Sequence, residues 1–389
     1  MAELSYISSD SHMSEPLDLW VERMDKKFRG RAPHMEPGHN GQEGVWWVYE
    51  GYPPHDLAVG IAGGKSRTEA EKAEFMKRGG YADARPGGWD PAERLKDMAV
   101  DGVAGEVLYT TLGFRLFWLL DPALQRECFR VYNDWLAEYC RYAPDRLKGL
   151  CLISLYDPKR GAAELERCAK MGLSGAMIWV TPPEDQPYHL DMYDVFWGRA
   201  QELGMVLSLH PPTGMERPKY EFGRENRALR STIAPHEIQK ALTVIIASGV
   251  LERSPELEVV SAEYGVGWVP HWLGRVNQAT GSGPSRRGGF ATKLTMKPSE
   301  YFARQVHVTY IDDQVGIKYR HDIGVDRIMW SNDYPHSAST WPKSAEYIDR
   351  DFEGSPEDQQ RIVWDNVSHL YGFKLTQSTR TSTPAPAAV

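Results

Sequence analysis

The sequence has few cysteines, no long apolar run and no block of basic residues. Only four of its 389 residues are cysteine, and no two of them form a Cys-x-x-Cys pair. This argues against a disulfide framework or a zinc knuckle and favours reduced, buried thiols. No stretch approaches the roughly 18 consecutive apolar residues of a membrane-spanning helix, and the N-terminus lacks the basic start of a signal peptide. We therefore expect a cytoplasmic protein that does not bind a membrane.

The charge of the chain is mildly acidic and evenly spread. Forty-five Lys and Arg residues stand against 53 Asp and Glu, which gives a formal net charge of −8. Nucleic acids and anionic membranes are bound by clustered basic residues, and the sequence has no such cluster. A small-molecule substrate is the expected partner.

Short β-branched runs that end in polar residues recur along the chain, with room for a helix between them. This spacing is typical of βαβ units rather than hairpins. Eight such runs predict a (β/α)8 TIM barrel, an α/β fold. The eight runs are Tyr6 to His12, Glu106 to Tyr109, Leu147 to Leu155, Leu173 to Val180, Met205 to His210, Leu257 to Glu263, Val306 to Ile311 and Arg327 to Asp333.

Helices are expected between these runs. Asp157 is a plausible N-cap for one of them, and Gly249 is placed to stop another. The expected helices span Pro122 to Tyr142, Pro158 to Lys170, Tyr193 to Leu203 and Pro235 to Ser248.

Three segments depart from the barrel repeat. Residues 27–96 are rich in Gly, Pro and aromatic residues and form a long insertion after the first strand, which we expect to fold over the barrel mouth as a lid. Residues 279–297 are glycine-rich and polar, as expected of a mobile loop. Residues 376–389 are low in complexity and are expected to be a flexible tail. Residues 1–375 are predicted to be one barrel domain.

Polar side chains follow several of the predicted strands. Asp10 and His12 end the first run, His210 the fifth, Glu263 the sixth and Asp333 the eighth. The C-terminal ends of barrel strands meet on one face, so these side chains are expected to converge. Each alone is more simply a capping or hydrogen-bonded residue. Together they would be a costly cluster of carboxylates without a cation, and they predict a metal site.

Five stretches together resemble one family. They are residues 10–20, 85–109, 207–212, 248–270 and 329–342, with the sequences DSHMSEPLDLW, RPGGWDPAERLKDMAVDGVAGEVLY, LSLHPP, SGVLERSPELEVVSAEYGVGWVP and MWSNDYPHSASTWP. In combination they resemble the amidohydrolase superfamily, in its amidohydrolase-related branch, which includes aminocarboxymuconate semialdehyde decarboxylase and resorcylate decarboxylases. The resemblance implies a (β/α)8 barrel with a divalent metal at its mouth.

The resemblance also implies roles for four of the strand-end residues. The family's metal ligands fall on Asp10, His12, His210 and Asp333, and the aspartate commonly also handles a proton. Two positions depart from the family pattern: the first strand carries Asp-x-His where many relatives have His-x-His, and Glu263 stands where the decarboxylases place a histidine. The fourth strand does not end in the lysine that is carbamylated in two-zinc members, so a carbamate-bridged zinc pair is not expected.

Glu15 and His336 lie three residues beyond His12 and Asp333, so both could turn into the same cavity. If Glu15, Glu263 or His336 also binds metal, there are enough ligands for two ions. The alternatives are a salt bridge or a helix cap at Pro16 for Glu15 and a supporting hydrogen bond for His336. Oxygen-rich ligands suit Mn or Fe better than Zn. This pattern is similar to an α-aminoisobutyrate hydroxylase of the same fold, which uses an Fe/Mn pair and a related partner chain.

Substrate-binding residues are expected in the insertion and among the arginines. Trp46, Trp47 and Trp89 are candidates for walls of the pocket, with packing inside the lid as the alternative. Arg115 and Arg304 are candidates for binding a substrate carboxylate, because the guanidinium fork matches it. Structural ion pairs are the alternative for most of the arginines considered, which also include Arg85, Arg94 and Arg224.

These features predict a metal-dependent hydrolase or decarboxylase of a small carboxylated or cyclic substrate. The metal would be Zn, Mn or Fe, and Asp333 or Glu263 would accept or deliver the proton. The alternative is a dinuclear Fe/Mn oxygenase that hydroxylates a small amino or carboxylic acid. A homo-oligomer, or a hetero-oligomer with a homologous chain, is expected.

Overall fold

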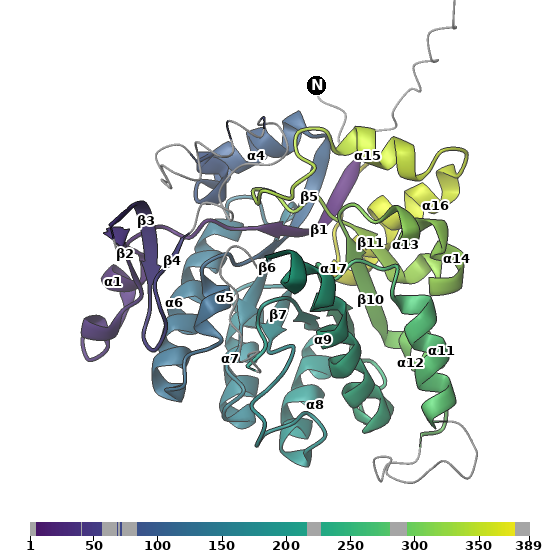
Figure 1. The fold of residues 1–389 in the computed structure, drawn as a ribbon, viewed down its shortest axis with the longest axis horizontal. Coiled ribbons are helices and arrows are strands. Elements are labelled where there is room, and N and C mark those ends of the chain that lie inside the picture. The colour runs from purple at the N-terminus through teal and green to yellow at the C-terminus, as the bar shows by residue number, and fades with distance from the viewer. Residues whose placement is uncertain are drawn as a thin grey trace, which may run out of the picture.

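The computed structural model describes residues 5–39, 41–56, 68, 71, 84–215, 227–280 and 294–377. At its centre is a parallel sheet of eight strands in the order β1-β5-β6-β7-β8-β9-β10-β11 (Figure 1). The strands are β1 Tyr6–His12, β5 Val103–Tyr109, β6 Leu147–Leu152, β7 Gly175–Ile178, β8 Val206–Leu209, β9 Val259–Ser261, β10 Val306–Tyr310 and β11 Ile328–Trp330. The Ser9 hydroxyl donates to the Trp330 carbonyl at 2.8 Å and so joins the two edge strands. The predicted (β/α)8 barrel is confirmed, and each strand lies at a predicted run.

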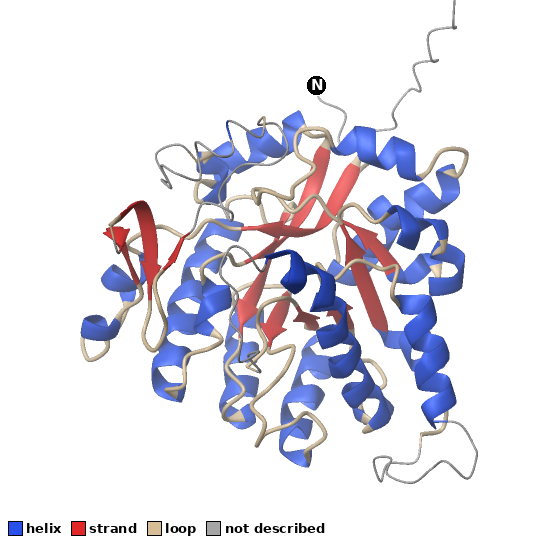
Figure 2. Cartoon of the chain, in the orientation of Figure 1, coloured by secondary structure: helices blue, strands red, loops and turns tan. Residues whose placement is uncertain are grey.

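Helices surround the sheet and cover its outer face (Figure 2). The α-helices are α1 Leu19–Arg23, α4 Pro91–Val100, α5 Gly113–Leu116, α6 Pro122–Cys140, α7 Pro158–Lys170, α8 Asp194–Leu203, α9 Arg227–Ala247, α10 Val250–Arg253, α11 Val269–Thr280, α12 Pro298–Gln305, α13 Gln314–Lys318, α14 Arg320–Ile323, α15 Ser344–Asp351, α16 Pro356–Gln360 and α17 Asn366–Tyr371. Shorter helical turns are η1 Arg29–Arg31, η3 Pro86–Gly88, η4 Asp191–Tyr193, η6 Val325–Arg327 and η7 Arg361–Asp365.

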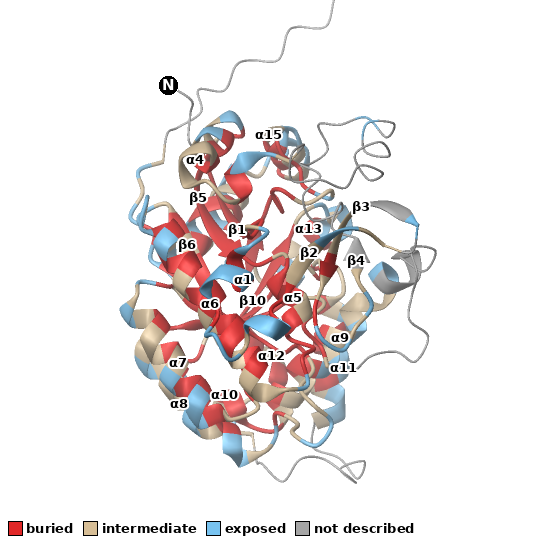
Figure 3. Cartoon of the chain, turned by 90° about the vertical axis from the view of Figure 1, so that its left-hand side faces the viewer, coloured by how far each residue is buried: buried red, intermediate tan, exposed pale blue. Residues whose placement is uncertain are grey.

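The core lies inside the barrel and between the barrel and its helices (Figure 3). Every residue of β1 and of β5 is buried, as expected of parallel strands that are covered on both faces. The four cysteines are buried and reduced, in agreement with the prediction.

Three of the four predicted helices begin and end within two residues of their predicted bounds. The Asp121 and Asp157 side chains accept hydrogen bonds from the first turns of α6 and α7. One boundary differs from the prediction: α9 begins at Arg227, so Pro235 lies inside the helix instead of at its start. Gly249 follows the end of α9 with φ 78°, a left-handed conformation that glycine adopts without strain.

The insertion after β1 contains a small antiparallel sheet of β2 His34–His39, β3 Gln42–Val48 and β4 His55–Asp56 (Figure 1). Trp47 of β3 is fully buried, and its ring centroid lies 5.1 Å from that of Trp20 on α1. This packing holds the small sheet against the helical layer of the barrel.

Parts of the predicted lid, loop and tail lie outside the described residues. They are residues 40, 57–67, 69–70 and 72–83 of the insertion, residues 281–293 of the loop and residues 378–389 of the tail. No helix in the described part of the chain is long and apolar enough to cross a membrane.

Candidate metal centre

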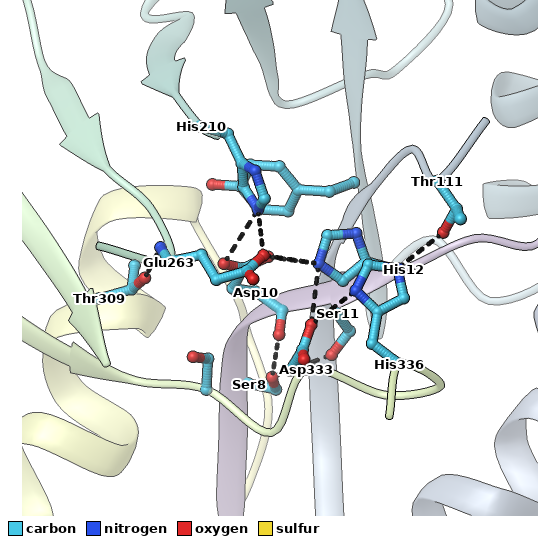
Figure 4. A network of polar contacts seen from close by, with 12 residues as sticks. Ser8, Asp10, Ser11, His12, Thr111, His210, Glu263, Thr309, Asp333 and His336 are labelled. Carbon is cyan, nitrogen blue, oxygen red and sulfur yellow. Dashed lines mark hydrogen bonds and ion pairs between the residues drawn. The ribbon is translucent and has the colours of Figure 1, made fainter. Parts of the chain in front are cut away.

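Six carboxylate and imidazole side chains converge at the C-terminal ends of the barrel strands (Figure 4). Two come from β1, one follows β8 directly, one lies in the loop after β9 and two lie in the loop after β11. They are Asp10, His12, His210, Glu263, Asp333 and His336. The strand-end residues that the sequence singled out are thus brought together by the fold, and His336 joins them.

The shortest contacts in this cluster run between imidazole nitrogens and carboxylate oxygens. His12 Nε2 lies 3.3 Å from Asp10 Oδ1, 3.1 Å from Asp333 Oδ1 and 3.8 Å from Glu263 Oε2. His210 Nε2 lies 3.5 Å from Asp10 Oδ2 and 3.1 Å from Glu263 Oε2. The two imidazole nitrogens therefore share Asp10 and Glu263 as neighbours.

Backbone carbonyls fix the orientation of both imidazole rings. His12 Nδ1 donates to the carbonyl of Thr110 at 2.9 Å, and His210 Nδ1 donates to the carbonyl of Pro211. With Nδ1 donating to a carbonyl, each ring directs Nε2 into the cluster. A metal-ligating histidine commonly has this arrangement, in which the second nitrogen donates to an oxygen.

Buried polar atoms at the centre of the cluster lack hydrogen bonds within the described residues. They are both carboxylate oxygens of Asp10 and of Asp333, and Nε2 of His12 and of His210. A buried carboxylate that accepts no hydrogen bond is costly, because it has lost its hydration. Binding of a divalent metal in the cluster would offset this cost.

The ligand atoms fall into two overlapping groups. Asp10, His12, His210 and Glu263 form one, and His12, Glu263, Asp333 and His336 form the other; within each, the ligand atoms lie within 4.8 Å of one another. The donor set mixes imidazole nitrogen with carboxylate oxygen. Such a set suits a first-row divalent metal such as Mn, Fe or Zn.

The surroundings shift the pKa values of the two imidazoles in opposite directions. Burial, together with the neighbouring charge of His336, lowers the pKa of His12 to about 3. Burial also acts to lower the pKa of His210, but Asp10 and Glu263 outweigh it and raise the pKa to about 10. His12 is therefore a neutral ligand, whereas on His210 a proton and a metal cation compete for the same place between two carboxylates.

The backbone is strained at two members of the cluster. Glu263 has φ 60° and Asp333 has φ 56°, and among the described residues these are the two non-glycine positions with positive φ. A left-handed conformation costs such residues about 1 kcal/mol or more, and it tends to persist where function requires it. The Asp333 N–H donates to the Asp10 carbonyl at 3.1 Å, which holds the strained turn against β1.

His336 links the cluster to the loop after β5. Its Nδ1 lies 3.0 Å from Asp333 Oδ1, and its Nε2 lies 2.9 Å from the Thr111 hydroxyl. Its ring stacks on that of His12 with centroids 3.7 Å apart. Burial acts to lower the pKa of His336, but Asp333 and Glu263 outweigh it and raise the pKa. His336 is thus placed either to bind a metal or to hold a proton beside Asp333.

Glu15, which the sequence also suggested as a ligand, lies outside both groups. Its carboxylate accepts hydrogen bonds from the backbone N–H groups of Thr111 at 3.1 Å and Leu112 at 2.9 Å, and from the Thr110 hydroxyl. It is fully buried and caps the start of α5. The structure thus places Glu15 in the role of a helix cap instead of a metal ligand, because its oxygens are already occupied.

Substitution of Glu15 by glutamine is expected to leave metal content unchanged and to lower the free energy of unfolding by about 1–3 kcal/mol, because buried N–H donors lose a charged acceptor. Glu22→Gln, at an exposed position on α1, is the matched control. Metal analysis and urea unfolding of both variants check this. Loss of metal from the Glu15→Gln protein would indicate that Glu15 is a metal ligand.

The predicted substrate-binding residues are scattered. Arg115 lies on α5 at the mouth, with its guanidinium 4.6 Å from the ring centroid of Trp118. Trp89 follows η3 and is half-buried, as is Trp46 on β3. For these three, contact with substrate stays a prediction.

Two other substrate-binding predictions differ from the structure. Trp47 is fully buried against α1 and does not line a pocket, because its ring fills the space between the small sheet and the helix. Arg304 lies in the last turn of α12, two residues before β10 and at the opposite end of the barrel from the cluster, where it donates to the Leu251 carbonyl at 2.7 Å. Arg224 lies outside the described residues.

Sequence reasoning missed Phe114 and Thr111. The Phe114 ring stacks on His210 with centroids 4.6 Å apart, and Thr111 contacts His336. Both residues follow β5, in the type of loop that forms the active-site face of a barrel. Their position after a predicted strand was the signal that could have identified them.

A buried hydrogen-bond network supports the ends of β1 and β11 from below. The Ser8 and Ser11 hydroxyls donate to Asn332 Oδ1 at 3.1 and 2.9 Å. The Asn332 amide donates to Asp101 at 3.3 Å, and Asp101 also accepts from the N–H and hydroxyl of Ser344. This network ties the residues next to Asp10 and Asp333 to α15.

Asp101 is expected to make stability depend on pH. Burial raises its pKa to about 6, so the folded state holds the proton more tightly than the unfolded state does. Its contribution to stability is therefore greatest at acid pH and is lost as pH rises through about 6. Between pH 4.5 and 7, the free energy of unfolding of the wild type is expected to fall by about 2 kcal/mol more than that of Asp101→Asn. Urea unfolding of both proteins checks this, and parallel pH profiles would contradict it.

Comparison with known proteins agrees with this geometry. The sequence profile of the amidohydrolase family matches residues 18–373. A γ-resorcylate decarboxylase from Polaromonas sp. is 26% identical over 291 residues, which are 67% of this chain and 80% of that protein.

Solved structures share the fold. An amidohydrolase from Mycobacterium avium subsp. paratuberculosis has a TM-score of 0.75 and 22% identity, over 95% of this chain and 99% of that one. A dihydroxybenzoic acid decarboxylase from Polaromonas sp., solved with manganese and the inhibitor 2-nitroresorcinol, has a TM-score of 0.63 and 19% identity, over 96% of this chain and 98% of that one. At these identities the likeness extends to the fold alone.

Proposed function

The chain belongs to the amidohydrolase family, and from that premise we propose that it is a metal-dependent decarboxylase of an aromatic carboxylic acid. The observation that carries the proposal is the cluster of buried carboxylate oxygens and imidazole nitrogens at the C-terminal end of the barrel, of which six atoms make no hydrogen bond within the described residues. The γ-resorcylate decarboxylase similar to this chain supports the reaction type.

The metal would be held by His12 and Glu263, which belong to both ligand groups, together with Asp10 and His210 from one group and Asp333 from the other. Three of these five ligands are carboxylates, which favours Mn or Fe over Zn. The manganese in the related decarboxylase structure supports Mn as the first metal to test. When bound, the cation supplies Lewis-acid stabilisation to a substrate carboxylate and an adjacent oxygen.

In decarboxylation the bond between ring and carboxylate breaks, CO2 leaves, and its electron pair stays on the ring carbon until a proton arrives. Asp333 is the proposed proton donor, because it is buried at the centre of the cluster. His336 Nδ1, 3.0 Å from Asp333 Oδ1, is placed to return a proton to it. The contact between His336 and Thr111 orients the ring for that transfer.

Aromatic rings flank the cluster and support an aromatic substrate. The ring of Phe114 stacks on His210, and that of Tyr109 lies 5.1 Å from His210 and 5.9 Å from His12. Aromatic surfaces of this kind favour flat ligands through offset or edge contacts. Arg115 on the neighbouring helix is the proposed partner for a further anionic group of the substrate.

The proposal is tested by a substrate screen. Protein stripped of metal and reloaded with Mn²⁺ is mixed with 2-hydroxybenzoate, 2,6-dihydroxybenzoate and related acids, and CO2 is measured. The methyl esters of the same acids are the matched controls, since they offer a hydrolysable bond but no free carboxylate. The proposal expects CO2 from an acid and no product from any ester; ester hydrolysis without CO2 would contradict it.

One observation favours a second candidate, a dinuclear oxygenase. The two overlapping ligand groups together comprise six residues, which could supply ligands to two ions. A hydroxylase with Fe and Mn would then act on a small amino or carboxylic acid, with a homologous partner chain. Two metal ions per chain, together with O2 uptake that matches the loss of substrate, would favour this candidate over the decarboxylase.

A further inference from the structure

Residues 85–97 contact two of the four strand ends that carry metal-site side chains, those of β1 and β11. This segment comprises η3, Trp89 and most of α4, and it forms the C-terminal end of the insertion, before β5. The Ser14 N–H, two residues beyond His12, donates to the Gly88 carbonyl at 3.0 Å. The segment is the RPGGWDPAERLKD part of a motif that carries the family resemblance, yet its side chains lie outside the ligand groups.

Arg94 of α4 connects this segment to β1. Its side chain is fully buried, its Nε donates to Glu106 Oε2 at 2.6 Å, and one terminal nitrogen donates to the carbonyl of His12 at 2.8 Å. A buried guanidinium needs such partners to offset its lost hydration, and its planar fork reaches both at once. The backbone of a proposed metal ligand is therefore held by a charged side chain from outside the site.

The same arginine contacts the loop that carries Asp333. Its guanidinium lies 4.6 Å from the ring centroid of Tyr334, the next residue after Asp333. The Tyr334 hydroxyl donates to Asp97 Oδ2, and the Tyr334 carbonyl accepts from the His12 N–H at 2.6 Å. Asp97 is held in turn by Arg85, whose Nε donates to it at 3.1 Å.

Close packing leaves this arrangement little freedom. A Cβ on Gly87 would lie 2.7 Å from Asp97 Oδ2 and 3.0 Å from the Tyr334 hydroxyl oxygen. Only glycine fits there without displacing the two groups. η3 therefore packs directly against the hydrogen bond between Tyr334 and Asp97.

We propose that residues 85–97 form a bracket that sets the separation of His12 and Asp333, with Arg94 and Asp97 as positioning residues. Arg94 fixes the His12 backbone, and Asp97 fixes Tyr334 and through it Asp333. Metal affinity depends steeply on such supporting contacts, whose loss commonly costs about 10–100-fold. The bracket acts on metal binding whatever reaction the site performs.

The test uses Mn²⁺ alone, so that no substrate is needed. Arg94→Lys keeps a charge for Glu106 but cannot also reach the His12 carbonyl, and Tyr334→Phe keeps the ring over Arg94 but loses the bond to Asp97. Lys96→Gln, on the same helix with a side chain 69% exposed, is the matched control. Readouts are the Mn²⁺ dissociation constant, the electron paramagnetic resonance spectrum of bound Mn²⁺ and the melting temperature of the metal-free protein.

The bracket predicts a dissociation constant raised about tenfold in Arg94→Lys and about threefold in Tyr334→Phe, with an altered spectrum of the bound ion in both. Lys96→Gln is expected to match the wild type. Unchanged affinity and spectrum in both variants would overturn the proposal, even if metal-free melting temperatures fall, because the segment would then be structural only. If Arg94→Lys does not fold, Tyr334→Phe decides. Absence of Mn²⁺ binding in the wild type would contradict the proposed metal site. That outcome is distinct from Mn²⁺ binding that is the same in the wild type and both variants, which would contradict the bracket alone.

Discussion

Substitution of Asp333 by asparagine is expected to lower the rate of CO2 release by about a thousandfold. Asparagine keeps the shape of the side chain and an oxygen that can face the metal, but it cannot deliver a proton to the ring carbon. General acid catalysis contributes about 10²–10⁴-fold to enzymatic rates, which sets the size of the effect. Steady-state turnover of the Mn²⁺-loaded variant, with its metal content measured on the same sample, checks the expectation.

The control for this variant is Asp326→Asn. Asp326 is 60% exposed and pairs with Arg361 in η7, remote from the cluster. Its activity is expected to equal that of the wild type. If Asp333→Asn retained full metal and more than a tenth of the wild-type rate, Asp333 would not be the proton donor.

Replacement of His210 by alanine is expected to abolish metal binding while the barrel still folds. The substitution removes a nitrogen ligand and leaves His12 as the one remaining imidazole beside the Asp10 and Glu263 carboxylates. The bound metal is expected to fall below about one tenth of the wild-type content, because structural support for the remaining ligands is also lost. Metal analysis after gel filtration, with circular dichroism to report the fold, measures both parts of the prediction.

His321→Ala is the matched control for the loss of an imidazole. His321 lies on α14, is 69% exposed and contacts Asp358. We expect this variant to keep its metal. Added imidazole is expected to restore part of the metal binding of His210→Ala, because it fills the space next to Phe114 with the missing ligand. If His210→Ala bound as much metal as the wild type, His210 would not be a metal ligand.

The barrel and the strand-end residues of the site could be predicted because both depend on local patterns. Buried parallel strands appear as short apolar runs, and the residues that end such runs must meet at one face of a barrel. The strand pattern alone therefore groups Asp10, His210 and Asp333 at one end of the fold. The same rule would have placed Arg304 at the opposite face, since it lies just before a predicted strand.

The remaining features depend on the paths of loops, which local patterns do not specify. Glu15 follows β1 closely enough to enter the cavity, but the loop after β5 brings three backbone N–H groups to its carboxylate. Trp47 belongs to a small sheet whose packing on α1 decides that its ring is buried. The pairing of Arg94 with Glu106 joins a helix to a strand across the back of the site, and no periodicity in the sequence indicates that contact.

The central claim, that the metal cluster carries a decarboxylation, is tested most directly by isotope labelling of the product. Mn²⁺-loaded protein is supplied with the acid found in the substrate screen, in D2O and under ¹⁸O2, and the aromatic product is analysed by mass spectrometry. We predict one deuterium on the carbon that carried the carboxylate, no ¹⁸O, and CO2 equal to the substrate consumed. A product that contains ¹⁸O, or one formed without CO2, would contradict the account.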